Sequence, residues 1–111
     1  MSDLDKVIAR MTHEHYLPDK GWDKIIIKLD EKLARIDPDY KIYQIKEKFG
    51  TLRFYYDTSV NNRDLKRAMD RYVRIAEILS SVTCEMCGDR GDLKKELLWK
   101  KTLCERCYGK N

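Results

Sequence analysis

Four cysteines stand in two pairs in the last quarter of the chain, and its 111 residues contain no others. Each pair has two residues between its members, and sixteen residues separate the pairs: Cys84 and Cys87, then Cys104 and Cys107. A C-x2-C pair typically forms a tight turn whose two thiolates converge on one metal ion. Four thiolates leave no open coordination position, so the spacing predicts a closed structural zinc site and not a catalytic one.

The same four ligands would also suit an iron site of the rubredoxin type, and the spacing alone leaves that alternative open. A thioredoxin-like redox pair is not expected, because neither C-x2-C motif follows a buried strand of a βαβ unit. Gly88 directly after the first pair supports the metal site, since glycine permits the turn that lets backbone amides point at thiolate sulfur.

A row of arginines is the next candidate for binding chemistry. Its members step by four, four and three residues along a predicted helix and therefore share one face: Arg63, Arg67, Arg71 and Arg74. Guanidinium groups bind phosphate or carboxylate through two hydrogen bonds at once, which favours a role in partner binding. The alternative is a solvated helix face, because the nearby carboxylates of Asp64, Asp70 and Glu77 neutralise part of the row.

Two smaller groups complete the candidate sites. Tyr43, Arg53 and Tyr55 are expected on the outer face of a β-hairpin, where they could stack on bases or anchor a protein partner. That face could equally be covered by the N-terminal helix or a second subunit. The run from His13 to His15 could chelate a metal from a loop, but nothing nearby completes a site, so we favour a structural or surface role.

No catalytic constellation is recognisable in the sequence. It has no Ser/His/Asp set with a nucleophile elbow and no phosphate-binding glycine-rich loop, and it contains only five glycines. We therefore expect a protein that is not an enzyme. With no signal peptide and no apolar stretch long enough to cross a bilayer, we expect it in the reducing cytoplasm of a bacterial cell, where paired C-x2-C motifs usually bind metal.

The net charge of +4 is unevenly distributed along the chain. Residues 1–57 carry eleven basic and eleven acidic side chains, whereas residues 58–111 carry twelve and eight. Four thiolates with one zinc dication add about two negative charges, which brings the metal-loaded second half to about +2. The general basic signal for nucleic-acid binding is therefore weak.

Hydrophobic periodicity predicts an α+β fold in which two or three helices pack on a β-hairpin. We expect helices over residues 3–11, 22–36 and 62–82, and a hairpin over 40–57. Pro38 should end the second helix, and Asn61 or Asn62 should cap the long one. Residues 1–82 would form the α+β domain. Because no Gly or Pro linker follows the long helix, residues 83–111 should form a zinc module docked on it.

The cysteine segment resembles a GATA-type zinc finger. The shared features are the two C-x2-C pairs, Trp99 before the second pair, and Leu103 leading into it. A knuckle, a hairpin around residues 94–102 and a terminal helix would together make a treble-clef-like module, and the resemblance supports this arrangement. In that family the helix enters the DNA major groove, but here the loop is acidic, and only four residues with a single lysine follow Cys107. The resemblance therefore supports the zinc site more than DNA recognition.

A second resemblance covers residues 20–107. The hairpin sequence IKEKFGTLRFYY, preceded by Gly21-Trp22 and followed by the cysteine pairs, is similar to a family of small, largely uncharacterised proteins of bacteriophages and prophages. This likeness implies a bacterial or phage setting and no particular activity. We expect a zinc-stabilised binding protein that acts on a host macromolecule, most simply a host or defence protein. The alternative is DNA or RNA binding through the zinc module and the arginine row.

Overall fold

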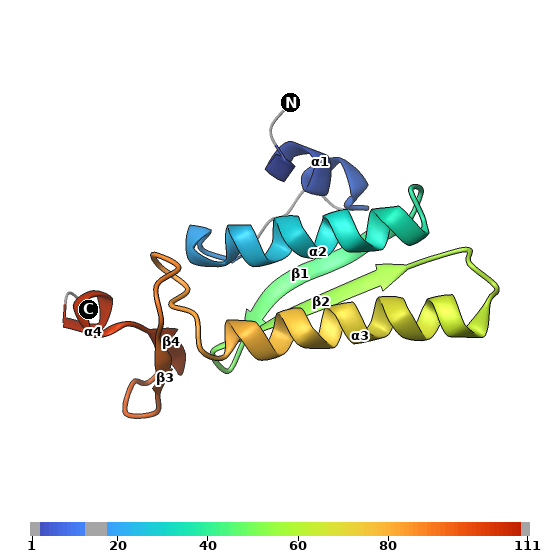
Figure 1. The fold of residues 1–111 in the computed structure, drawn as a ribbon. Coiled ribbons are helices and arrows are strands. Elements are labelled where there is room, and N and C mark those ends of the chain that lie inside the picture. Colours follow the sequence, from blue (N-terminus) through green and yellow to red (C-terminus); the bar gives the residue numbers. More distant parts are fainter. Residues whose placement is uncertain (1–2, 13–17, 110–111) are drawn as a thin grey trace.

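The computed structural model describes residues 3–12 and 18–109, and it confirms the α+β class (Figure 1). The first half contains α1 (Asp3–Arg10), the 3-10 turn η1 (Lys20–Trp22), α2 (Asp23–Ile36), β1 (Lys41–Lys48) and β2 (Thr51–Asp57). The second half contains α3 (Arg63–Ser80), β3 (Asp92–Lys94), β4 (Lys101–Leu103) and α4 (Glu105–Gly109). Within the described ranges, every helix is too short or too polar to span a membrane.

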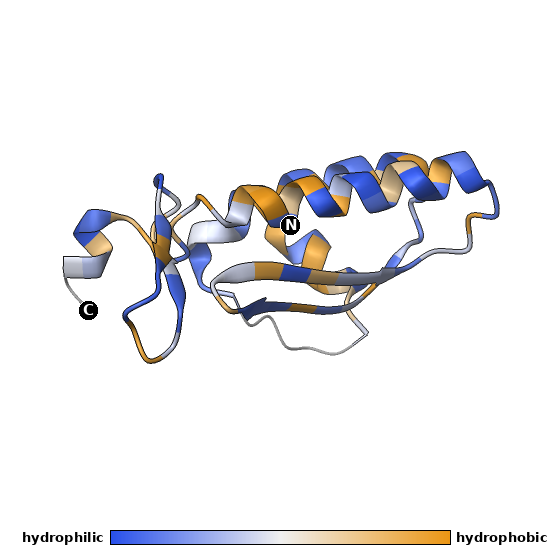
Figure 2. Cartoon of the chain, turned by 90° about the horizontal axis from the view of Figure 1, so that it is seen from below, coloured by the Kyte–Doolittle hydropathy of each residue, from blue (hydrophilic) through white to orange (hydrophobic). Residues whose placement is uncertain are grey.

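The body of the molecule has two layers, with α2 and α3 side by side on one face of the antiparallel β1–β2 hairpin (Figures 1 and 2). The buried apolar side chains form one cluster: Val7, Trp22, Ile26, Leu29, Leu33, Tyr40, Ile42, Ile45, Leu52, Phe54, Met69, Val73 and Ala76. A two-stranded hairpin is marginal in water, so its stability comes from this helical cover.

A β-bulge in β1 decides which side chains face the core. The pairing register shifts between Ile42 and Gln44, which leaves Tyr43 as the extra residue on its strand. Simple alternation would point Ile42 and Ile45 to opposite faces. The bulge reverses the alternation once, so both isoleucines are fully buried and Tyr43 is exposed.

The predicted end of α2 and the predicted N-cap of α3 are both confirmed. The last residue of α2 is Ile36, and Asp37 before Pro38 adopts extended geometry. The side chain of Asn62 accepts hydrogen bonds from the backbone N–H groups of Asp64 and Leu65, so Asn62 is the N-cap of α3.

The first helix is tied to the body by a charged contact. The Arg10 guanidinium pairs with Asp30 of α2 at 2.7 Å and lies over the Tyr40 ring, 4.7 Å from its centroid. The Tyr40 hydroxyl donates to the same Asp30 carboxylate. Burial of the ring and that carboxylate raise the pKa of Tyr40, so the hydroxyl stays protonated and the contact persists at neutral pH.

The residues that follow α3 form a small unit at one end of an elongated molecule of 46 × 29 × 20 Å (Figure 1). Its long-range hydrogen bonds reach η1 and the β1–β2 turn. Gly21 N–H donates to the Glu85 carbonyl at 2.9 Å, and the Trp22 indole donates to the Thr83 carbonyl at 2.9 Å. The Thr102 hydroxyl donates to the Gly50 carbonyl at 2.6 Å. The unit therefore contacts the body at elements far from α3 in sequence.

Candidate metal centre and exposed surfaces

The four cysteines converge on one point, and their sulfur atoms all lie within 4.8 Å of one another. The Sγ atoms of Cys87 and Cys104 are 3.6 Å apart. A tetrahedral ion with metal–sulfur distances of about 2.3 Å would separate its ligands by about 3.8 Å, so the spacing suits such an ion. All four donors are thiols, which is the ligand set of a closed structural site.

Local backbone geometry brings each pair together. In the first turn, the Gly88 N–H donates to the Cys84 carbonyl at 2.9 Å, and Gly88 has a positive φ of 87° that favours glycine. The second pair spans the start of α4, where the Tyr108 N–H donates to the Cys104 carbonyl at 2.9 Å. The Cys107 N–H also points at the Cys104 sulfur at 3.4 Å. Such N–H contacts stabilise thiolates that coordinate a metal.

The electrostatics of the cluster favour ionised sulfur at its buried end. Burial alone would raise the pKa of Cys84, but backbone N–H groups of Cys104, Cys87 and Met86 outweigh it and lower that pKa to about 6. Hydrogen bonding with Cys104 raises the pKa of Cys107 to about 12 in the metal-free cluster. A divalent metal ion would attract the negative charge of the thiolates and so favour ionisation of Cys107 as well. The residues present therefore fit a divalent metal.

A small shell of side chains surrounds the four cysteines. Cys84 and Cys104 are buried with Leu103, and Leu97 and Tyr108 pack against them. The Lys94 ammonium joins β3 to α4 through ion pairs with Asp92 at 3.0 Å and Glu105 at 2.9 Å. The contact with Glu105 holds β3 against α4, the helix that contains Cys107.

The predicted arginine row lies on the outer side of α3, and all four of its side chains are exposed. Arg67 and Arg71 line a shallow hollow of about 420 Å³ with Asp64, Ala68 and Tyr72. Arg74 lies apart from them, in a depression shared with Arg53, Glu77 and Ser81. Among the described residues, none of the four arginines forms an ion pair.

The three residues predicted on the outer face of the hairpin do not all lie together: Tyr43 and Tyr55 are exposed, whereas Arg53 lies next to α3. Tyr43 and Tyr55 are exposed, and the Lys46 ammonium lies 5.8 Å from the Tyr55 ring centroid. A hydrogen bond with Asp57 raises the pKa of Tyr43. Arg53 is half-buried and lines the depression next to Arg74 of α3. The candidate metal run from His13 to His15 lies outside the described residues.

Two apolar surfaces were missed by the sequence interpretation. The first is the tip of the β3–β4 loop, where Leu98 and Trp99 are 91% and 77% exposed. The second is a groove between α2 and α3. The exposed tip could have been predicted from the Leu-Leu-Trp run at residues 97–99, because the C-terminal unit is too small to bury all three side chains. The signal for the groove was an apolar stripe on α3 wider than one buried face.

No family model, curated protein or solved structure matches the chain. The resemblances to a phage family and to GATA-type fingers therefore stay predictions.

Proposed function

We propose that this chain is a small zinc-stabilised binding protein whose partner is another protein. The observation that carries the proposal is the apolar tip formed by Leu98 and Trp99. Burial of exposed tryptophan and leucine side chains in a partner's pocket lowers the free energy of the complex. Tryptophan is also enriched among the interface residues that dominate affinity. In Figure 2 the hydrophobic colour is visible at the lower end of this loop.

The metal's part in this proposal is to hold the base of the tip. The strands β3 and β4 have three residues each, and so short a hairpin is not stable by itself. The residue after β4 is the ligand Cys104, and β3 is tied to α4 by Lys94. Zinc is our proposed metal, with a treble-clef-like order of knuckle, hairpin and helix. It would supply rigidity and no reaction, since four thiolates close its coordination sphere.

The setting proposed for this binding is a bacterial cell, where a phage-encoded protein would engage a host or defence protein. Support for the setting comes from the hairpin motif and the reducing chemistry that four free cysteines require. Support for a protein partner comes from the exposed apolar tip, which a phosphate backbone would leave unburied.

Affinity purification from a bacterial lysate treated with nuclease tests this function. The bait is the metal-loaded chain, compared with the double variant Leu98→Ala, Trp99→Ala. We expect a protein that is retained by the wild type and lost with the double variant. Phe49→Ala is the matched control, because Phe49 is also an exposed apolar side chain but lies on the β1–β2 turn. Equal retention by all three baits would refute the tip as the contact.

A second candidate is nucleic-acid binding through the arginine row. All four arginines are exposed, and none of them forms an ion pair with another described residue, which supports this function. Fluorescence anisotropy with labelled DNA and RNA at low salt tests it directly. Binding that weakens steeply with salt and disappears in the variant Arg67→Glu, Arg71→Glu would establish this function in place of the first. Absence of binding at low salt would eliminate it.

A further inference from the structure

An exposed apolar seam runs along α3, separate from the face that packs on the sheet. The buried face consists of Met69, Val73, Ala76 and Ser80. The seam repeats at alternating steps of three and four residues, and its members are Leu65, Ala68, Tyr72, Ile75 and Leu79. This is the spacing of the a and d positions of a coiled coil, in which one helix packs against another.

Most of the seam remains open to solvent in the described structure. Leu65 is 43% exposed, Ile75 47% and Leu79 48%. A contiguous apolar surface of this kind on a small protein typically marks an interaction site. Helix α2 runs beside the seam and covers one side of it.

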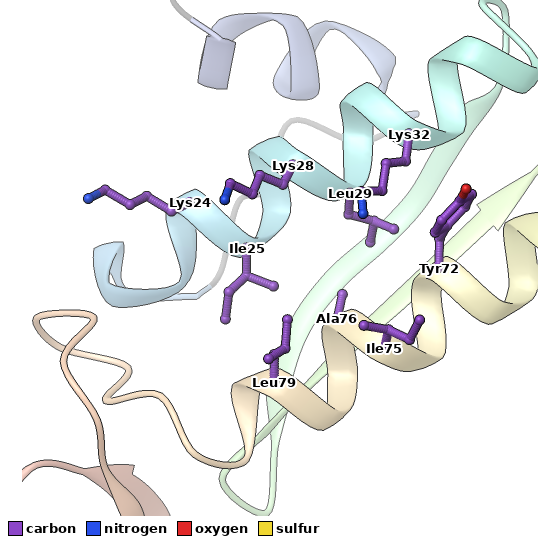
Figure 3. A pocket seen from close by; sticks show the side chains of 9 residues that line it. All are labelled: Lys24, Ile25, Lys28, Leu29, Lys32, Tyr72, Ile75, Ala76 and Leu79. Carbon is purple, nitrogen blue, oxygen red and sulfur yellow. The ribbon is translucent and has the colours of Figure 1, made fainter.

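Between α2 and α3 the seam becomes the wall of a groove (Figure 3). Leu29 and Ala76, both buried, lie deepest, while Ile25, Ile75 and Leu79 rise on the two sides. The pocket has a volume of about 230 Å³. A groove between two antiparallel helices suits a third rod-like element more than a flat surface.

The α2 side of the groove carries a row of positive charge. Lys24, Lys28 and Lys32 step by four residues and line the groove on that side (Figure 3). Among the described residues, none of the three forms an ion pair. The Lys32 ammonium lies 5.2 Å from the centroid of the Tyr72 ring, across the groove. Three unpaired cations beside an apolar seam favour an occupant with carboxylates beside its own apolar stripe.

We propose that this groove binds an amphipathic helix of a partner protein, with acidic side chains along one edge facing Lys24, Lys28 and Lys32. The seam from Leu65 to Leu79 would accommodate about four turns of such a helix, or about 21 Å at 1.5 Å per residue. Apolar residues of the partner helix would pack between those of the seam. The groove is a second contact surface, at a different place from the Leu98–Trp99 tip, and the inference rests on the proposal that the partner is a protein.

A second copy of the chain fits this groove less well. Pairing two identical grooves would bring their lysine rows together, with Arg71 also near the seam, and like charges in contact oppose association. An anionic lipid surface would match the charge, but a flat bilayer cannot fill a concave site between two helices. The charge and shape together therefore select an acidic helix.

The test measures binding of two labelled peptides to the metal-loaded chain by fluorescence anisotropy. Both have eighteen residues with leucine and isoleucine at the seam spacing, one with glutamates on its flanks and one with lysines. We expect the acidic peptide to bind, with affinity that falls as salt rises, and the basic peptide to bind at least tenfold more weakly. Equal binding of the two peptides, or no binding of either, would overturn the proposal.

Matched substitutions locate the contact on the groove. Ile75→Glu should weaken binding of the acidic peptide at least tenfold. Ile78→Glu is its control, because Ile78 lies on the same helix, is 58% exposed and does not line the groove. Lys28→Glu should weaken binding several-fold, whereas Lys66→Glu on α3 should not. Ile75 and Ile78 are both exposed, so a glutamate at either position should leave the fold intact, and thermal melting checks that each variant is folded. An unchanged affinity in Ile75→Glu would overturn the proposal.

The other occupants give distinct results that would also overturn it. A dimer in analytical ultracentrifugation that Ile75→Glu dissolves would assign the groove to a second copy. Sedimentation with phosphatidylserine vesicles that Ile75→Glu abolishes would assign it to lipid. The tip variant Leu98→Ala, Trp99→Ala should bind the acidic peptide normally. Loss of lysate capture in that tip variant, with no peptide binding in the wild type, would uphold the proposed function and reject only the groove.

Discussion

The two ends of this molecule are stabilised by different means. In the body, thirteen buried apolar side chains from α1, η1, α2, β1, β2, α3 and the α2–β1 link form one core. In the C-terminal unit, the buried cluster consists of Cys84, Cys104 and Leu103, with three partly buried neighbours. So small a core cannot offset the conformational entropy of some twenty-five ordered residues, which is about 1–2 kcal/mol each for the backbone. We propose that a metal ion held by the four cysteines would supply the stability that hydrophobic burial supplies in the body.

The contrast extends to the use of apolar residues. The body fully buries its tryptophan, Trp22, whereas the C-terminal unit leaves Trp99 exposed together with Leu98. If a metal holds this unit together, its stability does not require Trp99 to be buried, and the exposed ring is then available to the proposed partner. Substitutions in one region, each compared with a matched control, separate the two modes of stabilisation.

Leucine truncation should affect the two regions very differently. Leu52 of β2 is fully buried, so Leu52→Ala should lower the free energy of unfolding by about 2–5 kcal/mol through lost burial and a new cavity. Leu98→Ala is the matched control, and at an exposed position it should change stability by less than about 0.5 kcal/mol. Urea denaturation monitored by circular dichroism measures both. Equal costs would mean that the tip is packed against something in solution.

The contact between the regions depends on a glycine that has no room for a side chain. A Cβ added to Gly21 would lie 2.2 Å from the Cys84 carbonyl oxygen and 2.4 Å from the Glu85 carbonyl carbon. Gly21→Ala should therefore displace the C-terminal unit and cost about 1–3 kcal/mol of stability. Gly109→Ala is the control, because nothing lies within 4 Å of its added Cβ. Thermal melting of both metal-loaded variants checks this, and an unperturbed Gly21→Ala would show that the two regions are not docked.

The smallest expected effect concerns acid stability of the body. The Thr58 hydroxyl, which donates to the Asp37 carboxylate, holds the pKa of that carboxyl below its ordinary value of 3.8. A folded-state pKa below the unfolded one means that the unfolded chain binds the proton more readily. The contribution is present above the unfolded pKa and is lost as pH falls through the folded pKa.

Thr58→Val should therefore remove part of the stability at neutral pH and less of it in acid, with Thr58→Ser as the control that keeps the hydroxyl. Urea denaturation at pH 7 and below pH 3.8 measures the difference. The same loss at both pH values would show that the hydrogen bond to Asp37 does not cause it.

Much of this architecture was predictable because its signals are local. Asn62 as a cap and Pro38 as a helix end act on their immediate neighbours, and the cysteine spacing is itself a local signature. The exact face that α3 buries was not predictable, since its apolar residues occupy more of the helix than the sheet can cover. The bulge at Tyr43 and the contact at Gly21 were also missed, because each depends on a partner strand or segment distant in sequence.

The candidate site divides in the same way. The convergence of the four cysteines followed from their spacing, whereas the exposure of Leu98 and Trp99 contradicts the usual tendency of large apolar residues to be buried. Only the small size of the C-terminal unit hinted at that outcome. The placement of Arg53 beside Arg74 required knowledge of how β2 lies against α3.

Hydrogen exchange with and without a chelator tests most directly whether metal replaces a hydrophobic core in the C-terminal unit. Metal removal should abolish amide protection over residues 84–109, while the β1–β2 hairpin keeps its protection because its own apolar core remains. Unchanged protection of residues 84–109 after verified metal removal would contradict the account. So would loss of protection in the hairpin to the same extent, because it would show that the body also depends on the metal.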